Sequence, residues 1–428
     1  MKQEAIFFFF FPPEFPSRSL YARVSRVDSL STSPQRRASY KFDCIDADYV
    51  DGAGPQLLDG FHADHTKPFA LLRVVTTPAR FGDFAGATPA PADWFYLEIE
   101  PGRSGLPAWH AQLQGNGYSV HSRGVLTYAR RLDAPDELTG PRSRPQSLGA
   151  SVAPRLVLPS PLAGACMALT NPASRAKIST ILKSVPQAGT VLVRDVGQAN
   201  FVSLCDDLGR AVLHFDVGLP ISFNRHTRPS KFNIDPNERA PIILSHWDWD
   251  HLHGAFEFPH FLDCPWIVPD QRLGPGAARL ARMLGEKGNL LVRPANARIR
   301  FPFGELVRSG GPVGDLNDSG LTVLAILASG RSALLAGDAD YAHLMHSNAH
   351  RIDHLVATHH GARFNASQRS VPRPNRRGGT LVISYGYRNV YRHPHREALA
   401  KHAKSGRRNY VTTAGRKGIA LRGDRAIS

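Results

Sequence analysis

The chain reads Ser245-His246-Trp247-Asp248-Trp249-Asp250-His251 directly after the apolar run Pro241-Ile242-Ile243-Leu244, which is typical of a buried strand. Histidine and aspartate side chains therefore crowd together where a strand ends. Imidazole nitrogens and carboxylate oxygens are the ligands that borderline and hard divalent cations accept. A helix start capped by Asp248 or Asp250 is the alternative, but capping requires neither histidine. The cluster predicts a metal site.

Further polar motifs lie at the ends of other strand-like runs in the second half of the chain. They are Asp195-Val196-Gly197-Gln198, Asp216-Val217-Gly218, Asn317-Asp318-Ser319-Gly320, Gly337-Asp338-Ala339, His359-His360-Gly361 and Asn389-Val390-Tyr391-Arg392-His393-Pro394. Loops at strand ends are where folds of this kind keep functional side chains. Taken singly, each of these motifs is also compatible with an ordinary turn.

In this order the motifs resemble the metallo-β-lactamase superfamily, and within it the soluble hydrolase domain of the DNA-internalisation protein ComEC. The superfamily motif His-x-His-x-Asp-His appears here as His246-x-Asp248-x-Asp250-His251, and the usual third-motif histidine near Asn317 is absent. The resemblance covers roughly residues 188 to 425. It implies a four-layer αββα sandwich, with an additional mixed or β-rich region in front of it.

The resemblance also implies a centre with two divalent metal ions, Zn or Mn. One ion would be held by His246 and Asp248, the other by Asp250, His251 and His359, and Asp338 would bridge them. The catalytic group would comprise Asp250, His360 and His393, and either histidine would protonate the leaving oxygen. The order of His359 and His360 is open to reversal. Support from behind the ligands is expected from Asp195, Gln198, Asp216, Asn317 and Asn389.

The charge of the chain is concentrated near its C-terminal end. The formal net charge is +16, and residues 361–428 hold sixteen Lys and Arg against two acidic residues. Such a one-sign region beside a catalytic cleft favours an anionic substrate, although basic drift of the host genome is the alternative. The arginines expected to contact phosphates are Arg363, Arg376, Arg377 and Arg392.

We therefore expect a metal-dependent phosphodiesterase or nuclease that acts on DNA or RNA with a metal-bound hydroxide. Two alternatives stay open. One is a hydrolase of the same fold that acts on a small ester, lactone or phosphodiester. The other is a nucleic-acid-binding subunit without catalytic activity. The absent third-motif histidine keeps this last alternative open.

Composition sets the expected organisation of the chain. Its 428 residues suffice for two domains, and we expect an accessory domain over 1–140, a Pro/Ser-rich linker and helix over 141–187, and the hydrolase domain over 188–428. The longest apolar runs are far below the roughly 18 to 20 residues that span a membrane. The four cysteines lie far apart and form no C-x-x-C pair, which favours reduced thiols and a cytoplasmic location.

Overall fold

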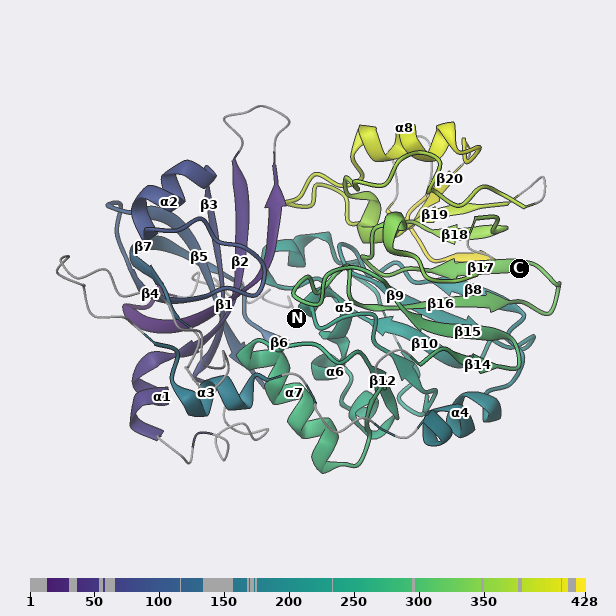
Figure 1. Ribbon diagram of the computed structural model, residues 1–428, viewed down its shortest axis with the longest axis horizontal. Helices are drawn as coiled ribbons and strands as arrows, with labels where there is room; N and C mark the ends of the chain where they lie inside the picture. The colour runs from purple at the N-terminus through teal and green to yellow at the C-terminus, as the bar shows by residue number, and fades with distance from the viewer. Residues whose placement is uncertain are drawn as a thin grey trace, which may run out of the picture.

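The computed structural model describes most of the chain and arranges it as three β-sheets with short helices (Figure 1). The residues described are 14–30, 37–53, 57, 66–115, 117–133, 157–167, 169, 173, 175–232, 234–294, 297–347, 350–375, 379–408, 410–414 and 421–428. One sheet lies in the N-terminal part, on the left of Figure 1, and the other two lie together on the right.

The N-terminal sheet closes on itself as an antiparallel barrel. Its strands are β1 (Arg18–Ser29), β2 (Ala38–Asp46), β3 (Phe69–Thr76), β4 (Trp94–Glu100), β5 (Leu106–Gln114), β6 (Gly117–Tyr118) and β7 (Ser122–Arg131). The order is β3-β2-β1-β4-β7-β5-β6, and an additional pairing of β3 with β5 closes six of the strands. Apolar side chains such as Leu20, Phe42 and Leu72 fill the barrel, as expected where every second residue faces inward. Two helices accompany it, α1 (Ala47–Ala53) and α2 (Pro78–Ala85).

The second sheet is mixed and has the order β13-β12-β11-β10-β9-β8-β21. Its strands are β8 (Thr190–Val193), β9 (Phe201–Cys205), β10 (Ala211–Val217), β11 (Ile242–Ile243), β12 (Trp266–Val268), β13 (Leu290–Val292) and β21 (Arg425–Ile427). The strands from β10 to β13 run parallel. Parallel neighbours end at the same edge of a sheet, so the loops after β10 and β11 meet there.

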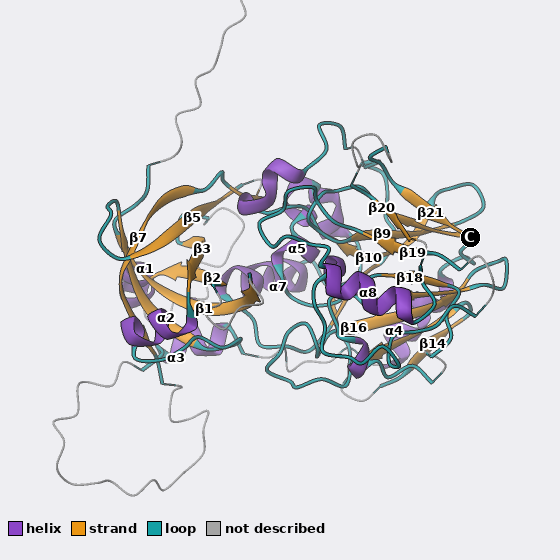
Figure 2. Ribbon diagram, turned by 90° about the horizontal axis from the view of Figure 1, so that it is seen from above, coloured by secondary structure: helices purple, strands orange, loops and turns teal. Residues whose placement is uncertain are grey.

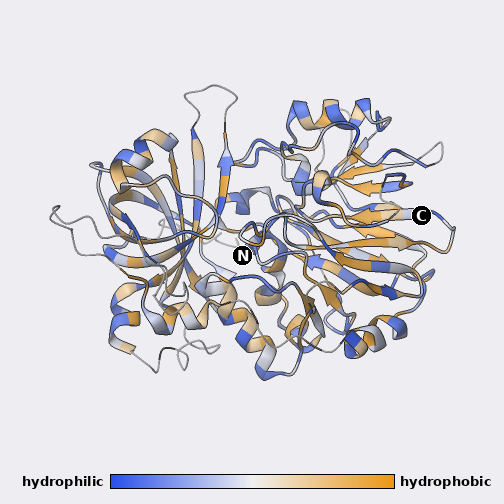
Figure 3. Ribbon diagram, in the orientation of Figure 1, coloured by the Kyte–Doolittle hydropathy of each residue, from blue (hydrophilic) through white to orange (hydrophobic). Residues whose placement is uncertain are grey.

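The third sheet is also mixed, with the order β14-β15-β16-β17-β18-β19-β20. Its strands are β14 (Ile299–Phe301), β15 (Gly304–Arg308), β16 (Leu321–Ile326), β17 (Ser332–Leu335), β18 (His354–Val356), β19 (Leu381–Ile383) and β20 (Tyr410–Thr412). It packs face to face on the second sheet, because Phe215 and Ile243 of one share a buried core with Val323 and Leu335 of the other. Hydrophobic residues run along the strands of both sheets (Figure 3).

The expected four-layer αββα sandwich is wrong. The structure has a closed six-stranded antiparallel barrel and two mixed sheets, and its helices do not build two outer layers. The described helices beyond the barrel are α3 (Ser160–Ala165), α4 (Arg175–Ser184), α5 (Trp249–Leu252), α6 (Gly254–Glu257), α7 (Pro275–Glu286) and α8 (Arg396–Lys404). Most are short, and α7 packs against β2 and β3 of the barrel (Figure 2) as well as against β13. The helix α7 therefore lies between the barrel and the second sheet.

The barrel is docked on the second sheet through a continuous apolar core. Tyr118 of the barrel meets Trp249 edge to face, with ring centroids 4.6 Å apart. The Asp43 carboxylate accepts hydrogen bonds from the backbone N–H groups of Gly276 and Ala277, at 3.1 and 3.3 Å, in the first turn of α7. These contacts hold the outer faces of β1 and β2 over the edge of the second sheet where residues 245–251 lie.

None of the described helices is both long and apolar enough to cross a membrane.

Candidate metal centre

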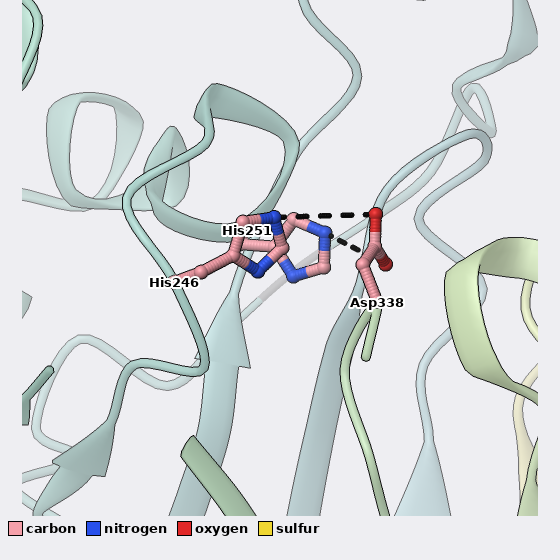
Figure 4. Close-up of side chains that lie close together, drawn as sticks. All are labelled: His246, His251 and Asp338. Carbon is pink, nitrogen blue, oxygen red and sulfur yellow. Dashed lines mark ion pairs between the residues drawn. The ribbon is translucent and has the colours of Figure 1, made fainter. Parts of the chain in front are cut away.

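The polar residues that follow several strands meet at one end of the two mixed sheets. His246, Asp248, Asp250 and His251 follow β11, and Asp338 follows β17. The turn η6 (Thr358–Gly361) follows β18, the parallel neighbour of β17, and carries His359 and His360. Figure 4 shows that His246 and His251 point towards Asp338 across the space between the sheets. The centre is thus assembled from segments far apart in the chain.

The distances between these side chains suit a bound cation. His251 Nε2 lies 3.2 Å from Asp338 Oδ1, and His246 Nε2 lies 4.0 Å from Asp338 Oδ2. His360 Nε2 lies 3.7 Å from Asp250 Oδ2 and 3.9 Å from Asp338 Oδ1. Ligands held about 2.1 Å from a tetrahedral ion are separated by about 3.4 Å. Two groups could hold a metal ion, one of His246, His251 and Asp338 and the other of Asp250, His251 and His360.

Buried polar atoms without hydrogen-bond partners converge on the same point. They are His246 Nε2, Asp250 Oδ1, His251 Nε2, Asp338 Oδ2 and His360 Nε2. A buried polar atom left unsatisfied costs about 1–3 kcal/mol, and five at one place are unusual in a native fold. A divalent cation would satisfy nitrogen and carboxylate oxygen together, so the donor set fits such an ion.

Asp216, at the end of β10, fixes the orientation of His251. One carboxylate oxygen accepts the Ser245 backbone N–H at 2.6 Å, and the other accepts Asn200 Nδ2 at 2.7 Å and lies 2.7 Å from His251 Nδ1. His251 Nδ1–H therefore donates to Asp216 and leaves Nε2 facing Asp338. Burial alone would lower the pKa of His251, but Asp338 and Asp216 raise it well above its ordinary value. Asp216 thus lies behind His251 and orients its ring.

Two cations from the barrel enter the centre. Lys41 Nζ donates to both oxygens of Asp248, at 2.6 and 2.8 Å, and Arg26 Nη1 donates to Asp250 Oδ2 at 3.2 Å. Arg26 also contacts His359 Nε2 and is bonded through Nε to Asp28 at 2.9 Å. Both cationic side chains are almost fully buried.

Sequence reasoning missed Lys41 and Arg26. Each lies in a strand where polar and apolar residues alternate, as in Tyr40-Lys41-Phe42, and such alternation is typical of a strand with one solvent-facing side. The two residues pair directly across β1 and β2. Like charges opposite one another are unfavourable unless carboxylates face them, so the observed pairing points to carboxylates on that side, but the sequence alone did not show the pairing.

The adjoining histidines divide into one inside the ligand group and two beside it. His360 belongs to the group with Asp250 and His251, whereas His359 contacts Arg26 and lies 3.4 Å from Asp338 through Nε2. The geometry therefore favours the reversed order, with His360 as ligand. His393 packs beside both, with ring centroids 5.5 Å from His359 and 6.4 Å from His360.

The remaining supporting residues are distributed unevenly. Gln198 Nε2 lies 3.3 Å from His393 Nδ1, and Asn389 accepts the backbone N–H groups of Tyr391 and His393, so both shape the His393 turn. Asp195 is not brought to the centre, because Arg422 binds both of its oxygens. Asn317 lies in the turn before β16, where its carbonyl accepts the Gly320 N–H at 3.4 Å.

Of the four arginines expected to bind phosphate, the structure describes Arg363 and Arg392. Arg363 is bonded to Glu397 at 2.8 Å, and Arg392 is exposed in the turn that carries His393. Arg376 and Arg377 lie outside the described residues.

The histidine turn is held from behind by a buried hydrogen-bond chain. The Thr358 backbone N–H donates to the Tyr341 hydroxyl oxygen at 3.2 Å, and that hydroxyl lies 2.9 Å from His402 Nε2 in α8. His402 Nδ1 lies 2.8 Å from the Ala398 carbonyl, so Nδ1–H donates there and Nε2 accepts from Tyr341. The chain requires a neutral imidazole at His402.

Acid is therefore expected to destabilise the fold through His402. Burial lowers its pKa to about 4, against about 6.5 in an unfolded chain. The unfolded chain binds the proton first, so this contribution is complete above about pH 6.5 and is lost towards pH 4, by up to about 3 kcal/mol. Thermal unfolding at neutral pH and near pH 4.5 measures the loss. Between these two pH values, His402→Gln should lose clearly less stability than the wild type does. An equal loss in the two proteins would contradict the assignment of this effect to His402.

Comparisons with known proteins add little to this geometry. No protein-family model and no curated protein matches the chain. Among solved structures, the chain is similar to a possible metal-dependent hydrolase from Veillonella parvula, with 12% identity and a TM-score of 0.32, over 56% of this chain and 99% of that one. A similarity of this size carries no argument about what this chain does.

Proposed function

We propose that the protein is a metal-dependent hydrolase that cleaves phosphodiester bonds of nucleic acid. The observation that supports this most strongly is the convergence of unsatisfied nitrogen and oxygen atoms from His246, Asp250, His251, Asp338 and His360. A divalent ion bound there would lower the pKa of a water molecule and neutralise charge that develops on a phosphoryl oxygen.

The orientation of His360 and the position of His393 both fit this role. His360 Nδ1 lies 3.0 Å from the Ser384 carbonyl, so Nδ1–H donates there and the Nε2 lone pair faces Asp250. With His360 among the ligands, His393 is the group placed to move a proton to the leaving oxygen. Burial, together with His359 and Arg26, lowers the pKa of His393 well below its ordinary value. An anionic substrate beside His393 would raise that pKa and favour protonation.

A row of basic residues on the barrel supports an anionic substrate. Paired residues across neighbouring strands point to the same face, and the pairs here run in sequence from β1 to β7: Arg26, Lys41, Arg73, Trp109 and Arg123. Exposure increases along this row, from buried Arg26 and Lys41 to half-buried Trp109 and exposed Arg123. The row therefore leads from the metal centre to the surface.

Trp109 makes this row suited to bind a single-stranded nucleic acid. The guanidinium groups of Arg73 and Arg123 lie 5.3 and 5.7 Å from the centroid of its ring. Cations that follow a phosphate backbone, interleaved with an aromatic face on which a base can stack, are the usual means of binding single strands. A labelled single-stranded oligonucleotide is accordingly the first substrate to test.

Removal of metal is expected to abolish cleavage. The purified protein is assayed on the oligonucleotide with Mn²⁺, Zn²⁺ or Mg²⁺, after EDTA, and after metal is restored. Activity should fall at least about a hundredfold with EDTA and should return with the ion, since the ion supplies the nucleophile. Asp338→Asn should behave as the chelated protein does. Cleavage that survives both EDTA and Asp338→Asn would refute a metal-dependent hydrolase.

The burial of the centre favours a second candidate, a hydrolase of small phosphodiesters. The exposed fraction of His246, Asp250, His251, Asp338 and His360 does not exceed 4% for any of them. A polynucleotide needs a wider approach to the metal than a small ester does. Hydrolysis of bis(nitrophenyl) phosphate without cleavage of any polynucleotide would select this candidate.

A further inference from the structure

The candidate centre offers one complete set of ligands. Both ligand groups include His251, and His251 Nδ1 is already bonded to Asp216 at 2.7 Å. Only Nε2 is left to bind a metal, and one imidazole nitrogen donates its lone pair to one ion. The two groups therefore cannot each hold an ion through His251.

Lys41 and Arg26 stand where a second ion would bind. Asp248 Oδ1 accepts Lys41 Nζ at 2.6 Å and the Trp249 backbone N–H at 2.7 Å, and Asp248 Oδ2 accepts Lys41 at 2.8 Å. Arg26 Nη1 lies 3.2 Å from Asp250, 3.7 Å from Asp248 and 3.8 Å from Asp338. A cationic nitrogen surrounded by three carboxylates has the surroundings of a metal ion.

The balance of buried charge agrees with this arrangement. Four buried carboxylates face the two barrel cations, namely Asp28, Asp248, Asp250 and Asp338. Two negative charges are left over among these six groups, and the buried Asp216 behind His251 adds a third. One divalent ion would reduce this excess to a single negative charge, whereas a second would turn it into a positive one.

We propose that the centre binds a single divalent ion and that Lys41 and Arg26 of the barrel take the place of the second. This inference rests on the proposed function and replaces the two ions expected from the sequence. The Arg26 guanidinium is held on both sides, by Asp28 and by the ring of Tyr391, whose centroid lies 4.5 Å away. A cation fixed in this way is suited to bind a substrate oxyanion, as an ion would. The barrel would thus complete the metal centre that the residues of the two mixed sheets form.

The count of bound ions tests the proposal without an activity assay. The full-length wild type is loaded with Mn²⁺ and washed, its metal content is measured by mass spectrometry, and its electron paramagnetic resonance spectrum is recorded. We expect one ion per chain and the spectrum of isolated Mn²⁺. Lys41→Met frees Asp248, so it should bind a second, weaker ion and show a spin-coupled signal.

Arg73→Met is the matched control, because Arg73 is the next basic residue in the row and is bonded to Ser39 at 2.8 Å. It should keep one ion. Lys41→Gln repeats the test if Lys41→Met fails to fold. Two ions in the wild type, or one ion in both folded Lys41 variants, would overturn the inference and leave the proposed hydrolase intact. No ion in the wild type would overturn the proposed function itself.

Discussion

Replacement of Asp250 by alanine is expected to remove both the bound ion and the hydrolytic activity. The Asp250 carboxylate lies between His360 Nε2 at 3.7 Å and Arg26 Nη1 at 3.2 Å, so under the proposed function it would be at once a ligand and a counter-charge. Burial alone would raise its pKa, but the positive charges of Lys41 and Arg26 hold that pKa well below its ordinary value. Asp250 is therefore ionised at neutral pH and available to a metal.

The expected loss in kcat/KM is roughly a thousandfold or more, because in the proposed reaction Asp250 would help to hold the ion that supplies the nucleophile. Stability should also fall, by about 3 kcal/mol, since Arg26 and Lys41 lose a buried partner. Metal content, steady-state cleavage and thermal unfolding are measured on the same preparation. Asp250→Asn keeps the volume of the side chain, and it should lose activity and metal with a smaller loss of stability.

Asp83→Ala serves as the matched control, because Asp83 is exposed on α2 of the barrel. Its cleavage rate and metal content should equal those of the wild type, with stability within about 0.5 kcal/mol. Metal-dependent cleavage at the wild-type rate in Asp250→Ala would place the reacting ion elsewhere in the molecule.

The ligand segments were predictable because each follows an apolar run. Ile242 and Ile243 form β11, and the cluster His246 to His251 comes directly after it. The same logic located Asp338 behind β17 and the His359-His360 pair behind β18. Strand ends bring such side chains to one edge of a sheet whatever covers its outer face. For that reason these side chains meet at one edge even though the expected sandwich was wrong, and their binding of a metal stays a prediction.

The contacts that the outer face of the barrel makes where it docks on the sheets were not predictable from the sequence. Lys41 alternates with Tyr40 and Phe42, a pattern that reads equally well with water on the polar side, and only docking of the barrel replaces that water with Asp248. Asp195 shows the same limitation for a residue that was expected at the centre and does not lie there. Its partner Arg422 lies 227 positions away, and no local pattern pairs the two. Periodicity identifies which residues share a face, but not what that face meets.

Gly218→Ala is expected to disturb the centre by displacing the backbone of Asp250. A β-carbon at position 218 would lie 1.8 Å from the Asp250 carbonyl oxygen and 2.8 Å from the Asn200 carbonyl oxygen. The Gly218 N–H donates to the Asn200 carbonyl at 2.8 Å, and the Asn200 N–H donates to the Asp250 carbonyl at 3.0 Å. Three backbone segments therefore meet where glycine alone leaves room. Backbone atoms cannot rotate away as the end of a side chain can, so we expect a loss of about 3 kcal/mol or more.

The displaced carbonyl belongs to Asp250, so the ion should bind more weakly even in the fraction of Gly218→Ala that folds. Thermal unfolding and metal titration measure the two effects separately. Gly52→Ala is the matched control, because a β-carbon there meets no atom within 4 Å and the residue is exposed at the end of α1, so its stability should stay within about 0.5 kcal/mol of the wild type. If Gly218→Ala has the unfolding temperature and the metal affinity of the wild type, residue 250 is free to move. A site whose ligand moves freely would not keep five unsatisfied atoms converged on one point, so that result would also weaken the assignment of the metal centre.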